Sequence, residues 1–240
     1  MKAVWVIDES SLIPWKKIVK ENKHKGVPTE RLIKNVNRQG IVLTKDTIWR
    51  VMMGCQITSA QRSGPDSLVS QFMNSSSKAL IYSECKKQDA LEKFICSEIK
   101  QLRFNTKISR QLSQIFEYLE NGGWTPLLAA LKSIEGSTTK AKEHAVVEHL
   151  TSGNFPGLGS KQARNFIQWL GLSQHVIPLD TRIFSRMKEY GITPVPKKGE
   201  GMGEEPLYRF FEDGLGQIAK MIGVLPCMLD ACTFASFDDR

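Results

Sequence analysis

The sequence predicts an all-α protein, and three observations lead to that class. Most apolar residues recur at the three- and four-residue spacing that places them on one face of a helix. Strand signals are confined to short runs such as 3–7 and 40–43. The chain has 240 residues, of which 41% are hydrophobic and 24% charged. This length and apolar content suffice for one or two domains with a sizeable core that needs neither disulfides nor metals.

The first predicted helix covers 46–62 and follows Thr44, a suitable N-terminal cap. It is apolar nearly all round, which is typical of a central, buried helix. Helical spacing of apolar residues predicts two more helices over 89–103 and 106–120, and Gly122-Gly123 ends the second.

Thr125-Pro126 provides a cap followed by proline at the first helical position and opens the next helix, which runs to Leu131. The later predicted helices cover 138–151, 160–170, 181–190 and 206–222. The Pro/Gly/Lys-rich loop 193–204 is the best candidate for a linker.

Cysteine content and apolar runs limit the cellular setting. Five cysteines, an odd number with a single close pair, indicate buried thiols rather than a disulfide framework or a metal cluster. No apolar run approaches the roughly 18 residues that span a bilayer. Asp8 and Glu9 come too soon for a signal peptide. We expect a protein that is not secreted, either cytoplasmic (nucleoid-associated) or nuclear, with no membrane partner.

The net charge of +8 favours a polyanionic partner. Residues 1–50 hold eleven Lys/Arg against five Asp/Glu, and residues 155–200 hold seven against three. A solvated basic surface explains each segment equally well. Two basic segments around a less charged middle also fit a protein that grips phosphates with two separate parts of its chain.

The most informative segment is 154–164, Asn-Phe-Pro-Gly-Leu-Gly-Ser-Lys-Gln-Ala-Arg. A helix, a turn containing Gly157 and Gly159, and a second helix direct successive backbone N–H groups outward, where a phosphate can approach them. A tight turn whose glycines only satisfy dihedral angles is the alternative. Lys161 lies in the first helical turn, where the helix dipole disfavours a cation, so it is a poor structural choice but a reasonable amine nucleophile.

A carboxylate follows nineteen positions later. Pro178 keeps the chain extended, and Asp180 falls where it can cap the helix that starts at Thr181. Most aspartates at such positions are purely structural. A carboxylate fixed by helix amides can also face a developing positive charge.

The paired motifs 155–161 and 176–183 resemble those of the helix–hairpin–helix DNA glycosylases, a family that includes endonuclease III and the 8-oxoguanine DNA glycosylases. Lys161 matches the Schiff-base lysine of the bifunctional members, and Asp180 matches the catalytic aspartate. Gln56 matches the glutamine that fills the gap left by an extruded nucleotide, although it also reads as an ordinary helix-end residue. The resemblance covers 46–190.

Two departures refine the resemblance. The cysteine-loaded loop of the iron–sulfur members is absent, which favours the cluster-free branch typified by 8-oxoguanine glycosylases. One helical turn after Lys161, where the human-type 8-oxoguanine enzyme has a cysteine, this chain has Asn165.

The resemblance implies two helical domains with a catalytic cleft between them. One comprises 46–172, and the other combines 1–45 with 173–240 and carries Asp180. It implies a bifunctional glycosylase and abasic-site lyase that flips an oxidised base, 8-oxoguanine, out of damaged double-stranded DNA and works as a monomer without a cofactor.

The resemblance also assigns site residues. The expected DNA contacts are Gln56, Gly157, Gly159, Ser160 and Arg164. The expected lesion pocket contains Asn165, Trp169 and Phe237. An alkali cation, Na⁺ or K⁺, would bind the backbone carbonyls of Gly153, Phe155 and Leu158.

Two other functions remain open at this stage. A non-catalytic helix–hairpin–helix module would bind DNA with no special role for Lys161 or Asp180. A monofunctional glycosylase for alkylated or mismatched bases would use the aspartate to activate water, but such enzymes usually lack the hairpin lysine.

Overall fold

The computed structural model describes residues 4–59, 61, 63–64, 66–192, 195–196 and 202–237. Every regular element in this part of the chain is helical, which confirms the all-α class. The described residues of the runs 3–7 and 40–43 form no strand. Trp5 instead packs on a helix and donates to the carbonyl of Phe210 at 2.8 Å, and Ile41 and Leu43 pack against a helical core. The linker candidate 193–204 lies partly outside the described residues.

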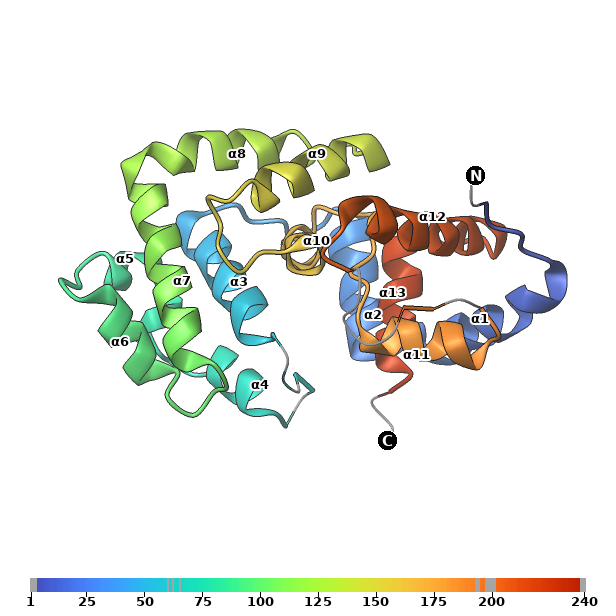
Figure 1. Cartoon of the computed structure of the whole chain (residues 1–240), viewed down its shortest axis with the longest axis horizontal. Helices are drawn as coiled ribbons and strands as arrows, with labels where there is room; N and C mark the ends of the chain where they lie inside the picture. The colour runs from blue at the N-terminus through green and yellow to red at the C-terminus, as the bar shows by residue number, and fades with distance from the viewer. Residues whose placement is uncertain are drawn as a thin grey trace.

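The helices form two bodies, which Figure 1 shows side by side. The first body contains α3 (Lys45–Ile57), α4 (Leu68–Met73), α5 (Tyr82–Cys85), α6 (Leu91–Glu98), α7 (Asn105–Tyr118), α8 (Trp124–Lys132), α9 (Lys140–Thr151) and α10 (Ser160–Trp169), with short helical turns at Lys78–Leu80 and Leu119–Gly123. The second body contains α1 (Glu9–Asn22), α2 (Gly26–Arg31), the π-helical turn Leu32–Val36, α11 (Thr181–Glu189), α12 (Glu205–Met221) and α13 (Pro226–Ala235).

Each body has its own hydrophobic core. The first core gathers buried side chains from Ile48 to Val176, and the second joins Leu12 and Trp15 to residues from Ile177 to Leu229. The cores therefore divide between Val176 and Ile177, four residues after the boundary expected at 172/173. Both ends of the described chain lie with the second body (Figure 1).

Several helix limits differ from the prediction, for local reasons. The helix expected over 46–62 ends at Ile57, and Thr44 caps it by accepting from the Thr47 amide. The helix expected at Thr125 begins at Trp124, so the proline lies in its first turn. Gly122, with φ of 102°, produces the break between α7 and α8 that the two glycines predict.

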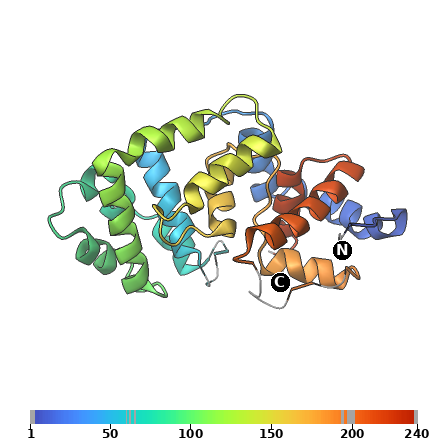
Figure 2. The same cartoon turned by 45° about the horizontal axis from the view of Figure 1, so that its top comes forward.

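In the described part of the chain, no single helix has the length and apolar character needed to cross a membrane. Only α12 and α13 taken together pass such a test, and they meet at a bend of 94°. Figure 2 shows α9 and α10 between the outer helices of the two bodies.

Candidate active site

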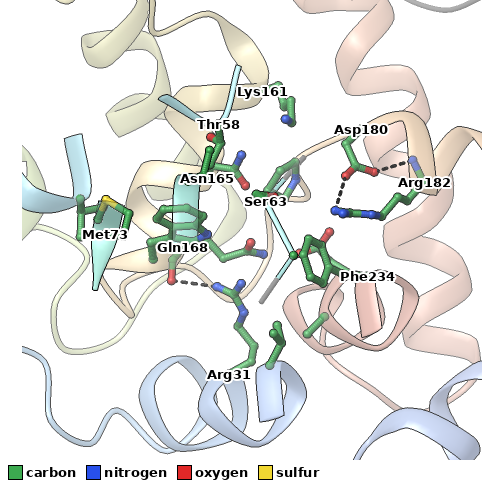
Figure 3. A pocket seen from close by; sticks show the side chains of 18 of the residues that line it. Arg31, Thr58, Ser63, Met73, Lys161, Asn165, Gln168, Asp180, Arg182 and Phe234 are labelled. Atoms are coloured by element: carbon green, nitrogen blue, oxygen red, sulfur yellow. Dashed lines mark hydrogen bonds and ion pairs between the residues drawn. The ribbon is translucent and has the colours of Figure 1, made fainter. Parts of the chain in front are cut away.

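A cleft of about 1440 Å³ lies between the two bodies. Side chains from α3, α10, the segment before α11, and helices α2 and α13 line it. Lys161 and Asp180 both belong to this lining and come from different walls (Figure 3). The structure therefore brings together the two residues that the sequence motifs single out.

Lys161 occupies the first turn of α10, directly after the turn that connects α9 to α10. Its side chain is half-buried. Gly159 is the N-terminal cap residue and has no side chain to offer, so no side chain of the described part of the chain caps the first amides of α10. Such a helix start carries the positive end of the helix dipole and suits an anionic group.

The two glycines of the turn serve different purposes. Gly159 has an ordinary φ of −80°, and a Cβ there would meet no atom of the described residues within 4 Å. As far as the described residues go, its surroundings are open, as the approach of a phosphate requires. Gly157 has φ of +88°, and a Cβ would lie 2.3 Å from the amide oxygen of Gln56. Gly157 therefore permits close packing inside the protein.

Gln56 is a correction to the expected DNA contacts. Its side chain is 1% exposed and donates to the carbonyl of Pro156 at 2.7 Å. This glutamine fastens the end of α3 to the hairpin turn. A side chain held in this way does not project toward a duplex, and the helix-end role left open at the sequence level fits it better.

Arg164 and Ser160 were also expected to contact DNA, but their side chains bind acidic residues inside the protein. Arg164 is fully buried and forms ion pairs with Glu205 and Glu212, each with an N···O distance of 2.7 Å. The hydroxyl of Ser160 donates to Glu205 at 2.7 Å. Neither side chain is available to DNA, so Arg164 is wrong as a DNA contact, and Ser160 can offer only its backbone amide.

Asp180 is the N-terminal cap of α11. Its Oδ1 accepts from the amides of Arg182 at 2.8 Å and Ile183 at 3.0 Å. Its Oδ2 lies 3.6 Å from the guanidinium of Arg182, and the side chain is 22% exposed. The predicted cap is thus confirmed. One carboxylate oxygen is fixed by helix amides while the group borders the cleft, so its orientation needs no adjustment when charge develops nearby.

Two of the three residues expected to form the lesion pocket lie at the cleft. Asn165 and Trp169 line the cleft, and Trp169 lies over Gly54 of α3 with 36% of its surface exposed. Phe237 is not part of this lining and lies 4.5 Å from the guanidinium of Arg186. Phe234 borders the cleft in its place and stacks on Arg182 at 3.9 Å.

Sequence reasoning missed a polar group at the other end of the cleft, which consists of Arg31, Gln168 and Asp230. Arg31 is buried and donates to the carbonyl of Gln168 at 2.8 Å (Figure 3). The side-chain amide of Gln168 is buried and interacts with Asp230. Burial raises the pKa of Asp230 to about 7, against the opposing effects of Arg31 and Gln168, which lower the pKa of that carboxyl. The sequence signal that could have revealed this group is Asp230, the one acidic residue in the otherwise largely apolar run 226–235.

The turn between α9 and α10 contains the carbonyls expected to bind an alkali cation. Neutral oxygen ligands suit such a hard cation. Gly153 has φ of 102°, which bends the turn, and the Phe155 carbonyl accepts from the Leu158 amide at 3.0 Å while keeping a second lone pair. The carbonyls of Gly153, Phe155 and Leu158 are thus of the donor type that such an ion takes, and an ion held by them would add positive charge beside the start of α10.

No family model and no curated protein matches this chain by sequence. Solved structures match it over nearly its whole length. The 8-oxoguanine DNA glycosylase of Thermotoga maritima aligns with a TM-score of 0.64 and 17% identity, covering 95% of this chain and 98% of that one. The Methanocaldococcus jannaschii 8-oxoguanine DNA glycosylase aligns with a TM-score of 0.63 and 15% identity, covering 97% of each chain.

A third structure is that of the Methanocaldococcus jannaschii 8-oxoguanine glycosylase/lyase in complex with a 15mer DNA containing 8-oxoguanine. It aligns with a TM-score of 0.63 and 13% identity, covering 95% of this chain and 99% of that one. These alignments confirm the expected architecture of two helical domains with a cleft between them. The chain has the helix–hairpin–helix fold of these 8-oxoguanine DNA glycosylases.

Proposed function

We propose that this protein is a DNA glycosylase with abasic-site lyase activity that removes 8-oxoguanine from double-stranded DNA. The observation that carries the proposal is the placement of Lys161 and Asp180 on different walls of one cleft. An amine at a helix start and a preorganised carboxylate are the two groups that this chemistry needs. The fold shared with structures of known 8-oxoguanine glycosylases supports the same assignment.

A base stacked in a duplex is out of reach of these groups, so the damaged nucleotide must rotate into the cleft. The open surroundings of Gly159 and the uncapped amides of α10 support a role in holding the backbone beside the lesion. Lys34 and Arg50 also line the cleft and add positive charge along it.

The reaction begins with Lys161 as a neutral amine. Its Nζ attacks C1′ of the sugar, and the glycosidic bond breaks with its electron pair leaving on the base, which takes up a proton. The resulting amine adduct opens the sugar ring and becomes an imine. Loss of a proton from C2′ then expels the 3′ phosphate by β-elimination and nicks the strand. Asp180 stabilises the positive charge that builds on the sugar while the glycosidic bond breaks.

The polar end of the cleft supports recognition of an oxidised purine. The carboxylate form of Asp230 accepts hydrogen bonds from N–H groups such as those on the pyrimidine edge of guanine. The Gln168 side-chain amide offers an NH₂ donor group and a carbonyl acceptor. 8-Oxoguanine differs from guanine by an added oxygen and an N–H. A site that pairs with this N–H leaves a buried acceptor unpaired when guanine enters, which costs about 1–3 kcal/mol.

A non-catalytic DNA-binding module explains the hairpin equally well. It gives no reason for a lysine and a helix-capping aspartate to share a cleft with a buried acid whose pKa is raised. A monofunctional glycosylase explains Asp180 and the cleft but leaves Lys161 without a task. The bifunctional enzyme uses all of these features.

A panel of lesion duplexes tests the proposal. Base release and strand nicking are measured separately on 8-oxoguanine, thymine glycol and uracil duplexes with each of the four opposite bases. We expect fastest release of 8-oxoguanine, with nicking that follows without alkaline treatment. Faster release of thymine glycol or uracil opposite all four bases contradicts the lesion assignment. Binding without release of any base contradicts the enzymatic proposal.

A further inference from the structure

The segment that delivers Asp180 to the cleft is held by side chains of two other helices. Glu143 of α9, which is fully buried, accepts from the backbone amides of residues 174, 175 and 176 at 2.7–2.9 Å. Glu212 of α12 accepts from the Ile177 amide at 2.8 Å. The hydroxyl of Tyr208 accepts from the Leu179 amide at 2.6 Å. Since residue 178 is proline, every amide from 174 to 179 is bound to a side-chain oxygen.

Glu212 binds the opposite wall by hydrogen bonds to Arg164, whereas the ring of Tyr208 only stacks on that guanidinium, at 4.1 Å. Oε1 of Glu212 accepts from Nε of Arg164 at 2.7 Å, on the same helix as Lys161 and three residues after it. The same oxygen binds the Ile177 amide, three residues before Asp180. One carboxylate thus contacts both the helix of the lysine and the segment of the aspartate.

The remaining contacts fix this carboxylate in place. The second oxygen of Glu212 lies 2.7 Å from Nε2 of His144, and the side chains of Glu212 and Arg164 are both fully buried. Burial alone would raise the pKa of Glu212, but the hydrogen bond from His144 and the charge of Arg164 outweigh it and lower that pKa. The group is therefore a permanent anion at neutral pH.

A buried ion pair contributes little to stability compared with apolar packing, because removing both charges from water offsets their attraction. The ion pair of Glu212 and Arg164 instead fixes the relative position of the groups that it joins. Displacing reacting groups by about 1 Å can reduce a catalysed rate by about 100-fold. A carboxylate bound to both walls is well placed to prevent such a displacement.

We propose that Glu212 is a positioning residue that sets the separation of Lys161 and Asp180 by binding Arg164 on one wall and the Ile177 amide on the other. The proposal rests on the proposed glycosylase function. Glu212 touches neither the substrate nor a reacting atom, and its effect is transmitted through those two contacts.

The test uses Glu212→Gln in the full chain. The amide has nearly the same shape but carries no charge. Arg164 donates to both oxygens of Glu212, so in either placement the NH₂ group of the glutamine faces a donor of Arg164, and the hold on that wall weakens. The matched control is Asp213→Asn, which removes the same charge from the next position of α12, where the side chain is 54% exposed and pairs with Lys140.

Two quantities are measured on an 8-oxoguanine duplex under single-turnover conditions: the maximal excision rate and the enzyme concentration at half-maximal rate. For Glu212→Gln we expect the maximal rate to fall about 100-fold and the half-saturating concentration to change by less than about threefold. Asp213→Asn should match the wild type. In an Asp180→Asn background, Glu212→Gln should reduce the rate by no more than about threefold. A wild-type rate for Glu212→Gln, or a full additional loss in that background, overturns the proposal.

Amide hydrogen exchange separates this inference from the proposed function. Glu212→Gln should accelerate exchange both at Ile177 and in the first turns of α10, whether or not the protein excises a base. Faster exchange on one wall alone overturns the coupling. If Glu212→Gln fails to fold, Arg164→Lys replaces it, since one ammonium cannot reach Glu205 and Glu212 together. The same rate loss and the same joint exchange are expected, and their absence overturns the proposal.

Discussion

Replacing Asp180 by asparagine separates its role as a helix cap from its proposed role in catalysis. The asparagine oxygen can still accept from the amides of Arg182 and Ile183, and Asn and Asp are equally good caps. The lost pair with Arg182 is partly exposed, at 22% and 25%, and contributes at most about 1 kcal/mol. The free energy of unfolding should therefore fall by no more than about 1 kcal/mol.

The expected effect on catalysis is much larger. A carboxylate about 4 Å from a developing unit of positive charge contributes about 4 kcal/mol at an effective dielectric constant near 20. Loss of that energy from the transition state reduces the rate by about 10³-fold. The assay is single-turnover excision of 8-oxoguanine, with chemical denaturation of the same protein to measure stability.

A second aspartate in the chain provides the matched control. Asp8 caps α1 by accepting from the Ser11 amide at 2.7 Å and does not belong to the cleft lining. Asp8→Asn makes the same chemical change at the same kind of position and should leave the excision rate unchanged. A rate for Asp180→Asn within about threefold of the wild type, with the fold intact, would refute the catalytic role and leave Asp180 as a cap alone.

Three further predictions concern other parts of the site. Gly157→Ala should lower the free energy of unfolding by about 1–3 kcal/mol, because its φ is +88° and Gln56 occupies the space of a Cβ. Gly159→Ala should preserve the free energy of unfolding and weaken DNA binding. Equal losses for the two variants in denaturation curves would contradict this prediction. Because the pKa of Asp230 is raised in the folded state, the free energy of unfolding of the wild type should fall as the pH rises from about 4 to about 7. The upper bound of this loss is about 4 kcal/mol, and screening by solvent in the cleft reduces the expected loss to about 1–2 kcal/mol. Asp230→Asn should lack this loss, and parallel pH profiles of denaturation would show that Asp230 is not responsible. Lys34→Gln should reduce the slope of log affinity against log salt by about one unit, and an unchanged slope would mean that this part of the cleft does not contact phosphate.

Local patterns in the sequence were enough to predict the elements that carry the site. The caps Thr44 and Asp180 and the glycine break before α8 depend on neighbours a few residues away, so the sequence displays them directly. Helix α1 was not predicted, because Pro14 lies inside it and its apolar face is interrupted by lysines. Helix α13 was not predicted either, because it is short and begins at Pro226.

The long-range partners were the part that local patterns could not supply. Arg164 looks like a phosphate contact beside Lys161, and only folding brings it to Glu205 and Glu212, which lie 41 and 48 positions away. Gln56 likewise looks like a free helix-end residue until the hairpin, 100 positions later, packs against it. Neither partner lies within the spacing over which helical periodicity carries information.

The central claim is that Lys161 forms a covalent bond with the sugar, and borohydride trapping on an 8-oxoguanine duplex tests it most directly. The wild type should give a stable protein–DNA adduct, and Lys161→Gln should give none while still binding the duplex. Lys34→Gln, which also removes a lysine from the cleft lining, should retain the adduct at saturating protein. An undiminished adduct with Lys161→Gln, or base release by the wild type with no adduct at all, would contradict the account.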